Sequence, residues 1–276
     1  MGFRINSNIG AMNANLQSNL NNIGVNKSVA SMASGSNLNY AAYDASGLGI
    51  ANQLSAQVSG LGQAIQNSNE SIGLVQVADG ALQEYGNILE RVNTLTIQAS
   101  NGTLNSSNRE AIQKEIDALM ESADDIATST TFNGIKLLDG TGGNSGDGTF
   151  VTQSGASAGD TQSVTIGDAK VASVIPGGID VTTQAGAEAS LGNIHSAIEN
   201  INGLRADLGA AQNQLMSNIQ NISVTQINVA SAESQIRDLD FAKESANFST
   251  QNILSQTGSW AQAQANASQA NVVNLF

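Results

Sequence analysis

Few side chains in this sequence could carry out acid–base, nucleophilic or metal chemistry. The chain has one histidine, His195, and no cysteine. A metal site needs several ligands, so His195 is interpreted as a solvated or partly packed helix residue. The neighbouring acids Asp124 and Asp125, and the pair Asp238 and Asp240, could act as acid–base pairs. Acids so close on a helix are more often a solvated face or ion-pair partners, so no catalytic site is predicted.

The sequence also lacks the short motifs that position reacting groups. It has no HExxH zinc motif, no Walker phosphate loop, no GxGxxG at a strand–helix junction and no GxSxG nucleophile elbow. The prediction is therefore a protein that is not an enzyme and that binds no cofactor and no metal.

The amino-acid composition excludes further classes of protein. The net charge is −13, while charged residues make up only 12% and aromatic residues 4% of the chain. An acidic chain with scattered Lys and Arg repels nucleic-acid phosphates. No apolar run reaches the roughly 18 residues that a membrane span needs. The N-terminus has no apolar core of a secretory signal peptide, and the absence of cysteine fits a reducing compartment or export without oxidative folding.

Charge is spread very unevenly along the chain. Residues 1–78 contain only Arg4, Lys27, Asp44 and Glu70, and residues 245–276 contain no charged side chain. Soluble single helices normally keep one charged face. Disordered polar tails would also be poor in charge, but the apolar periodicity of both ends argues against them. The sequence therefore predicts terminal helices that become buried against other chains.

Apolar residues recur at helical spacing through most of the sequence. Four stretches predict long helices, one of roughly 50 residues. The fourth has seven apolar residues spaced seven apart, a coiled-coil seam. Ser107 with Glu110 predicts a capping box at the start of the third helix. The stripes are Ile9, Met12, Leu16, Leu20, Ile23; Leu54, Val58, Leu61, Ile65, Ile72, Val75, Ala78, Leu82, Tyr85, Leu89, Val92; Ile112, Ile116, Leu119, Ala123, Ile126; and Ile194, Ile201, Leu208, Leu215, Ile222, Val229, Ile236.

The centre of the chain has a different character. Residues 139–185 are rich in Gly, Ser, Thr and Asp, and 150–152 and 163–166 alternate as strands. Asn133-Gly134 signals a turn. The predicted fold is mainly α, a long antiparallel coiled-coil bundle of N- and C-terminal segments with a small β-hairpin tip capping it. The two chain ends should meet.

Both halves of the sequence resemble bacterial flagellins, over about residues 1–140 and 185–276. Several motifs occur in the same order as in that family. They are 4–6 (RIN), 14–15 (AN), 44–51 (DASGLGIA), 98–103 (QASNGT), 131–138 (TFNGIKLL), 205–210 (RADLGA), 212–213 (QN), 232–234 (AES), 236–244 (IRDLDFAKE), 252–256 (NILSQ) and 264–266 (QAN). Two places depart from the pattern: 36–39 (SNLN) lacks the usual arginine, and Trp260 stands in the family's final apolar motif.

The resemblance implies an architecture and a function. Residues 1–43 and 235–276 would form the inner terminal-helix domain at the filament core, and 44–234 a helical bundle with the hairpin region. With only about 45 residues in its centre, the chain would be a minimal flagellin without large outer domains. The function implied is a structural subunit that polymerises into the bacterial flagellar filament for motility. A hook–filament junction protein is the alternative, because it shares the terminal helices.

The same resemblance implies partners and a location. They are other flagellin subunits, a cap protein, a hook-associated junction protein, a flagellin export chaperone and a host Toll-like receptor. Type III flagellar export would carry the chain to the extracellular filament without a cleaved signal peptide. A non-flagellar coiled-coil binding protein stays open as an interpretation of the stripes alone.

Two sets of site residues are predicted. Apolar positions in the stripes and near the C-terminus are assigned to self-assembly, and three positions that align with family receptor contacts are assigned to a Toll-like receptor. Asn93 and Thr94 do not match that receptor motif, so weakened recognition is expected. The self-assembly residues are Ile9, Leu16, Ile23, Leu54, Leu61, Leu208, Leu215, Ile222, Val229, Ile236, Ile253, Leu254 and Trp260, and the receptor residues are Arg91, Leu95 and Glu115.

Overall fold

The computed structural model describes residues 7–273, which fall into two compact units. One unit comprises Met1–Ala56 and Asn228–Phe276, and the other comprises Gln57–Ile227. The RIN motif at 4–6 and the residues after 273 lie outside the described part. Within 7–273, no helix has an apolar stretch long enough to cross a membrane.

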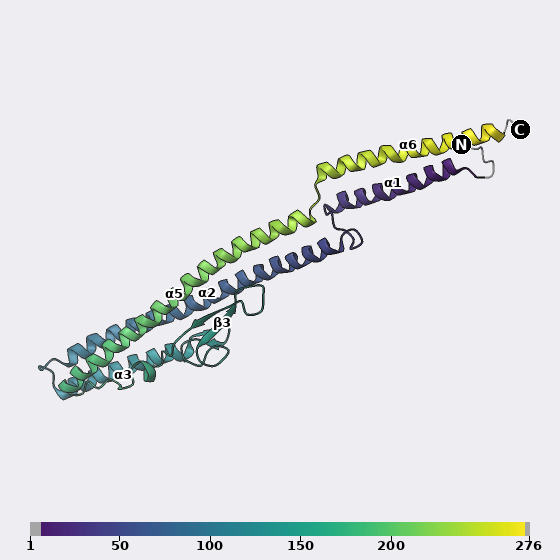
Figure 1. The fold of residues 1–276 in the computed structure, drawn as a ribbon. Coiled ribbons are helices and arrows are strands. Elements are labelled where there is room, and N and C mark those ends of the chain that lie inside the picture. The colour runs from purple at the N-terminus through teal and green to yellow at the C-terminus, as the bar shows by residue number, and fades with distance from the viewer. Residues whose placement is uncertain (1–6, 274–276) are drawn as a thin grey trace. The chain divides into compact units, whose positions relative to one another are not determined.

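The first unit pairs two helices from opposite parts of the sequence. Helix α1 (Ile9–Ser34) begins where the Asn8 side chain accepts the Ala11 amide, and it ends at Gly35 in the left-handed conformation, φ 68°. Helix α6 (Phe241–Val273) lies beside it (Figure 1). Asn8 Nδ2 donates to the Ala265 carbonyl at 3.1 Å, and Ser28 Oγ donates to Gln251 at 3.3 Å. These contacts make the pair antiparallel.

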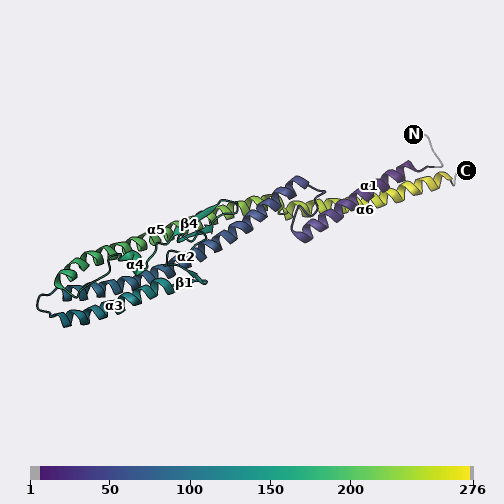
Figure 2. The same cartoon turned by 90° about the horizontal axis from the view of Figure 1, so that it is seen from below.

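The second unit is a bundle of three long helices, which lie side by side in Figure 2. They are α3 (Ser106–Ser129) and the parts within 57–227 of α2 (Ala45–Ala99) and α5 (Gln184–Arg237). Two adjoining clusters of buried apolar side chains hold them together, and both draw residues from all three helices. The predicted stripes supply most of the cluster residues that lie on these three helices. Helices α2 and α5 are continuous over 55 and 54 residues, as the periodicity predicted.

The start of α3 corrects one expectation. The predicted capping box of Ser107 with Glu110 is wrong, because the helix begins two residues earlier and its N-cap is Asn105. The Asn105 side chain accepts the Asn108 amide at 2.8 Å. Asn and Ser are about equally good N-caps, so two candidates this close cannot be ranked from the sequence.

Two small hairpins follow α3. Strands β1 (Thr131–Phe132) and β2 (Ile135–Lys136) are joined by the predicted Asn133-Gly134 turn, with φ of 51° and 78°. Positive φ at both positions is the signature of a type I′ turn. Strands β3 (Thr149–Gln153) and β4 (Thr161–Thr165) pair antiparallel with Phe150 opposite Val164, which confirms the predicted hairpin.

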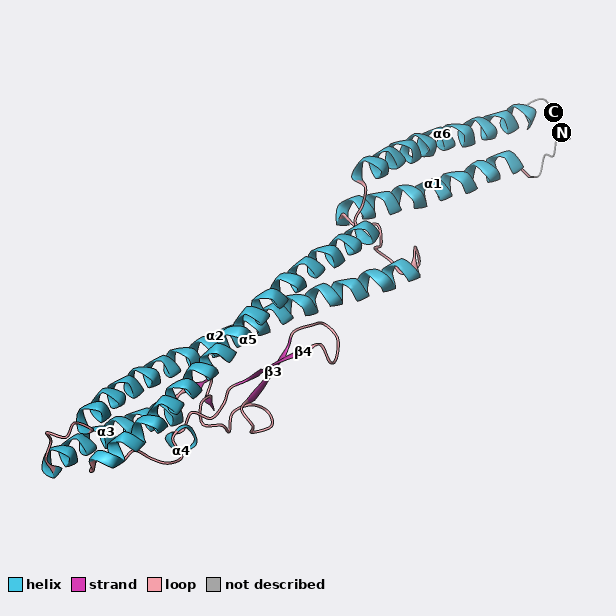
Figure 3. Ribbon diagram, turned by 60° about the vertical axis from the view of Figure 1, so that its left-hand side comes forward, coloured by secondary structure: helices cyan, strands magenta, loops and turns pink. Residues whose placement is uncertain are grey.

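The contacts place the β3–β4 hairpin along α2 and α5, whereas the sequence favoured a cap on the bundle. Figure 3 shows the hairpin lying along these helices. Asn67 of α2 donates to the Gln153 carbonyl at 3.2 Å, and Asn218 of α5 donates to Gln162 at 3.1 Å. Val164 and Ile166 enter the bundle core, followed by the one-turn helix α4 (Val171–Val174). The hairpin thus covers an apolar flank of the bundle.

Ion pairs and hydrogen bonds also stabilise the Gln57–Ile227 unit. Arg205 of α5 binds Asp79 of α2 at 2.8 Å, and that hydrogen bond raises the pKa of the arginine. Burial disfavours the charged form of Asp139. Hydrogen bonds from Thr141 and the nearby Lys170 and Lys136 outweigh that effect, so the pKa of Asp139 lies below its usual range.

Replacing Leu215 with alanine should destabilise the Gln57–Ile227 unit. Leu215 is completely buried in its core, and a Leu→Ala cavity costs about 2–5 kcal/mol. The adjacent Met216 is 47% exposed, so Met216→Ala is the matched control and should cost under about 1 kcal/mol. Urea unfolding followed by circular dichroism measures both. Equal losses for the two variants would contradict the assigned core.

Candidate functional site

Five large apolar side chains of α1 are exposed rather than buried against α6. Ile9, Met12, Leu16, Leu20 and Ile23 follow helical spacing, and each is between 52% and 68% exposed. Lys27 is the only charged residue in α1. A continuous apolar stripe without charges is rare on the surface of a soluble monomer and marks a contact surface.

The face of α1 that does meet α6 is built differently. Its residues recur at steps of three and four, as in a heptad seam, but most are small or polar. The opposing positions of α6 are similar, and Gly24 and Gly258 lie close to Gln251 and Ser18. The seam residues of α1 are Ala11, Ala14, Ser18, Asn21, Val25, Ser28 and Met32, and those of α6 are Phe248, Gln251, Ser255, Gly258, Gln262 and Ala265.

Helix α6 exposes apolar side chains in the same way. Ile253 is 64% exposed and Trp260, the single tryptophan of the sequence, is 81% exposed. Residues 245–270 of this helix carry no charge. A recess of about 410 Å³ lies along α1 and is bordered by Gln262 of α6, and its lining includes Met12 and Leu16 of the apolar stripe. The first unit therefore presents uncharged, apolar surface that the chain itself does not cover.

The predicted self-assembly residues fall into three groups by burial. One group is exposed on the first unit, a second is half-buried, and a third is buried in the core of the Gln57–Ile227 unit and is already occupied by intramolecular contacts. The exposed group is Ile9, Leu16, Ile23, Ile253, Leu254 and Trp260; the half-buried group is Leu54, Val229 and Ile236; the buried group is Leu61, Leu208, Leu215 and Ile222.

The structure adds exposed apolar positions that the heptad pattern did not single out. Met216, Val224 and Ile227 are exposed on α5, and Phe241 is exposed at the start of α6. On α5 these residues are offset from the buried seam of Leu215 and its equivalents. The sequence signal that could have found them is a second set of apolar residues on the same helix, offset from the first set.

The segment between α1 and α2 is tied to the end of α5. The Asn37 amide donates to the Arg237 carbonyl at 2.8 Å, and the Leu239 amide donates to the Gly35 carbonyl at 3.1 Å. Lys27 lies 4.3 Å from the centre of the Tyr43 ring, a cation–π geometry. These contacts hold the segment where the sequence lacks the family's usual arginine.

The three receptor positions do not have equal access to solvent. Arg91 of α2 binds Glu115 of α3 at 2.6 Å, and both side chains are about half exposed. Leu95 is only 3% exposed and belongs to the bundle core with Val92. The structure thus brings Arg91 and Glu115 together on the surface but turns Leu95 inward.

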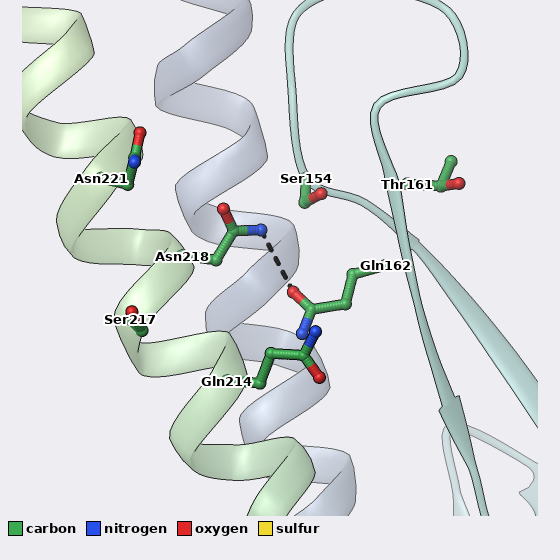
Figure 4. Close-up of a pocket in the computed structure, with 7 residues that line it drawn as sticks. All are labelled: Ser154, Thr161, Gln162, Gln214, Ser217, Asn218 and Asn221. Carbon is green, nitrogen blue, oxygen red and sulfur yellow. Dashed lines mark hydrogen bonds between the residues drawn. The ribbon is translucent and has the colours of Figure 1, made fainter.

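A polar recess lies between the β3–β4 hairpin and α5 (Figure 4). It has a volume of about 340 Å³ and is lined by uncharged Ser, Thr, Asn and Gln side chains. Figure 4 shows Asn218 donating to Gln162, which is largely buried. This amide contact fixes the hairpin on α5.

The described part of the chain shows no arrangement suited to metal binding. No group of three or more His, Cys, Asp or Glu residues within it could hold a metal ion. His195 is exposed on α5, in agreement with its interpretation as a solvated helix residue.

Burial and the nearby Asp124 and Asp168 raise the pKa of Tyr85, so its hydroxyl stays protonated inside the core.

Comparison with known proteins points to one family. The profile of the bacterial flagellin N-terminal helical region matches residues 5–142, and that of the C-terminal helical region matches residues 191–276. The sequence is 38% identical over 302 residues to a flagellin of Bacillus subtilis, with 99% of both proteins covered. It is 35% identical over 283 residues to a flagellar filament 31.3 kDa core protein of Treponema maltophilum, again with 99% of both covered.

A solved structure agrees with these relatives. The crystal structure of Bacillus cereus flagellin matches with a TM-score of 0.51 and 31% identity. The match covers 61% of this chain and 94% of that chain.

Proposed function

The chain belongs to the bacterial flagellin family and is a flagellar filament subunit, and we propose that the uncovered apolar faces of α1 and α6 are the surfaces through which its copies polymerise. The observation that carries this proposal is the stripe of α1, five large apolar side chains that are each more than half exposed. Burying such a side chain fully contributes about 1.5–3 kcal/mol. Several of them, covered by neighbouring copies, supply the drive for polymerisation.

The distribution of charge also favours α1 and α6 as the surfaces through which copies associate. The protein carries a net charge of −13, so two copies repel each other over most of their surface. Residues 245–276 carry no charge, and Lys27 is the only charged residue in α1. Copies that meet through these helices avoid the repulsion. An association that repeats one such contact without closing into a ring produces a helical polymer.

The other assignments form part of the same proposal. Residues 1–43 with 235–276 form the filament-core domain, and 44–234 form the bundle domain. The protein is not an enzyme and leaves the cell by type III flagellar export. An export chaperone, a cap protein and a hook-associated junction protein are its assembly partners. The family resemblance and the uncharged terminal helices support these assignments.

Truncating one side chain of the stripe tests the surface. Leu16→Ala should raise the critical concentration for polymerisation by about tenfold or more, because each 1.4 kcal/mol of lost burial is a factor of ten. The neighbouring Gln17→Ala removes little apolar area and is the matched control. Sedimentation measures the polymer, and the fluorescence of the single tryptophan, Trp260, reports its burial independently.

An unchanged critical concentration for Leu16→Ala would contradict a role of this stripe in assembly. So would equal effects of the two variants. A Trp260 emission that stays at the wavelength of exposed indole in the finished polymer would contradict the burial of α6.

Deleting residues 245–276 should abolish polymerisation and leave the Gln57–Ile227 unit folded. The deletion removes most of α6, whereas the bundle has its own core. Electron microscopy detects filaments, and urea unfolding compares bundle stability with that of the full-length protein. A truncated protein that still forms filaments would contradict the proposal, and short adaptor assemblies from the full-length protein would favour a junction protein.

We also propose a receptor contact at the Arg91–Glu115 pair. The two side chains lie together on the outside of α2 and α3, where a partner can reach both. Leu95 is buried in the core, so we expect it to act through the fold of the bundle rather than by direct contact. Since an exposed ion pair contributes only about 0–1 kcal/mol to stability, its removal changes recognition without unfolding the bundle.

Arg91→Ala should weaken Toll-like receptor signalling by the monomer, because it removes the cation a receptor would contact. A receptor reporter assay measures the response, and Arg109→Ala serves as the control, since Arg109 lies in the first turn of α3 and its side chain binds the Ala99 and Asn101 carbonyls. A reporter response to Arg91→Ala that equals that of the unmodified protein would rule the contact out.

A further inference from the structure

Three Asn-Gly steps occur in the sequence, and the structure gives each a different backbone. They lie at 101–102, 133–134 and 202–203, and all six residues are exposed. In such a step the glycine amide nitrogen can attack the carboxamide carbon of the asparagine, since glycine offers no side chain to hinder it. Solvent exposure does not distinguish the three steps, so their backbone geometry decides which one can react.

The step at 202–203 is protected by its helix. Asn202 and Gly203 lie inside α5, where each backbone amide is hydrogen-bonded to the preceding turn. The step at 133–134 forms the type I′ turn between β1 and β2, and that turn requires positive φ at both residues. Its residue types are therefore explained by the hairpin.

The step at 101–102 has neither constraint. It lies in the loop between α2 and α3, and Gly102 does not adopt a positive φ. A Cβ added at Gly102 would make only an ordinary contact of 3.8 Å with Gln184. Nothing in the local structure therefore demands glycine at this position.

The side chain of Asn101 also accepts a hydrogen bond that activates its carboxamide. Its Oδ1 accepts the Thr103 amide at 3.2 Å. That donor polarises the carboxamide and stabilises the oxyanion that forms when a nucleophile adds to it, as donors in an oxyanion hole do.

From this geometry we propose that Asn101 is a site of spontaneous hydrolytic modification. The Gly102 nitrogen loses its proton and bonds to the Asn101 Cγ, the bond between Cγ and Nδ2 breaks, and ammonia leaves with that proton. Water then opens the resulting succinimide ring to aspartate or isoaspartate. The net change consumes one water, releases one ammonia and adds one negative charge.

The loop can accommodate the new charge. Arg109 Nη2 donates to the Asn101 backbone carbonyl at 3.0 Å, and its Nε donates to the Ala99 carbonyl at 2.8 Å. Its guanidinium therefore lies beside the backbone carbonyl that becomes the free carboxylate in the isoaspartate product. The modification converts a neutral loop into one with a local ion pair at the end of the bundle helices.

Incubating the full-length folded protein at mildly alkaline pH and mapping its peptides by mass spectrometry tests the site. The peptide with Asn101 should gain the mass of an amide-to-acid conversion, and its isoaspartate should be a substrate for an isoaspartyl methyltransferase. The peptide with Asn202 should stay unconverted over the same time. In the urea-unfolded protein both should convert at similar rates.

Gly102→Ala is the matched variant, because the structure has room for the methyl group. It should slow conversion of Asn101 several-fold and leave circular dichroism and polymerisation unchanged. Conversion of Asn202 in the folded protein as fast as that of Asn101 would overturn the proposal. So would an Asn101 peptide that gains no mass, or a Gly102→Ala variant that converts at the original rate.

Discussion

The contact between α1 and α6 is made mostly of small and polar side chains, and most of the large apolar residues of both helices are exposed. A seam of Ala, Ser, Asn, Gln and Gly buries little apolar area, so the pair gains little from its own contact. Ordering each residue costs about 1–2 kcal/mol in backbone entropy alone. The two helices therefore depend for most of their stability on whatever covers Leu16, Trp260 and their neighbours. In a filament subunit, we propose that this cover is the next copies of the protein.

The Gln57–Ile227 unit follows the opposite arrangement. Its three helices turn their apolar stripes toward each other, and residues such as Leu82, Tyr85 and Leu215 are completely buried. This unit also carries most of the acidic residues, which suits a surface that stays in water. Folding and association are thus assigned to separate parts of one sequence. The same kind of apolar periodicity serves both, and only the presence of a partner stripe within the molecule distinguishes them.

Whether an apolar stripe has a partner within the molecule could not be predicted from the sequence. The heptads of α5 and the stripe of α2 predicted long helices, and the Asn133-Gly134 turn and the β3–β4 hairpin were predicted from local patterns. The position of the hairpin against Asn67 and Asn218 depends on contacts between residues far apart in the sequence. For the same reason, periodicity could not separate Leu215, a core residue, from Leu16, an exposed one. The family resemblance supplied the function, and no local pattern did.

The side chains in the seam between α1 and α6 also determine how specifically these two helices pair. Large residues in a seam select partners by filling holes, whereas small residues accept close approach and leave selection to hydrogen bonds. Here Asn8, Ser28 and Gln251 make those bonds, and Gly24 leaves room for the Gln251 side chain. A pair aligned by polar contacts in this way holds its register without being rigid by itself. If neighbouring copies cover the apolar faces as proposed, the stiffness of the polymer becomes a property of the assembly rather than of the subunit.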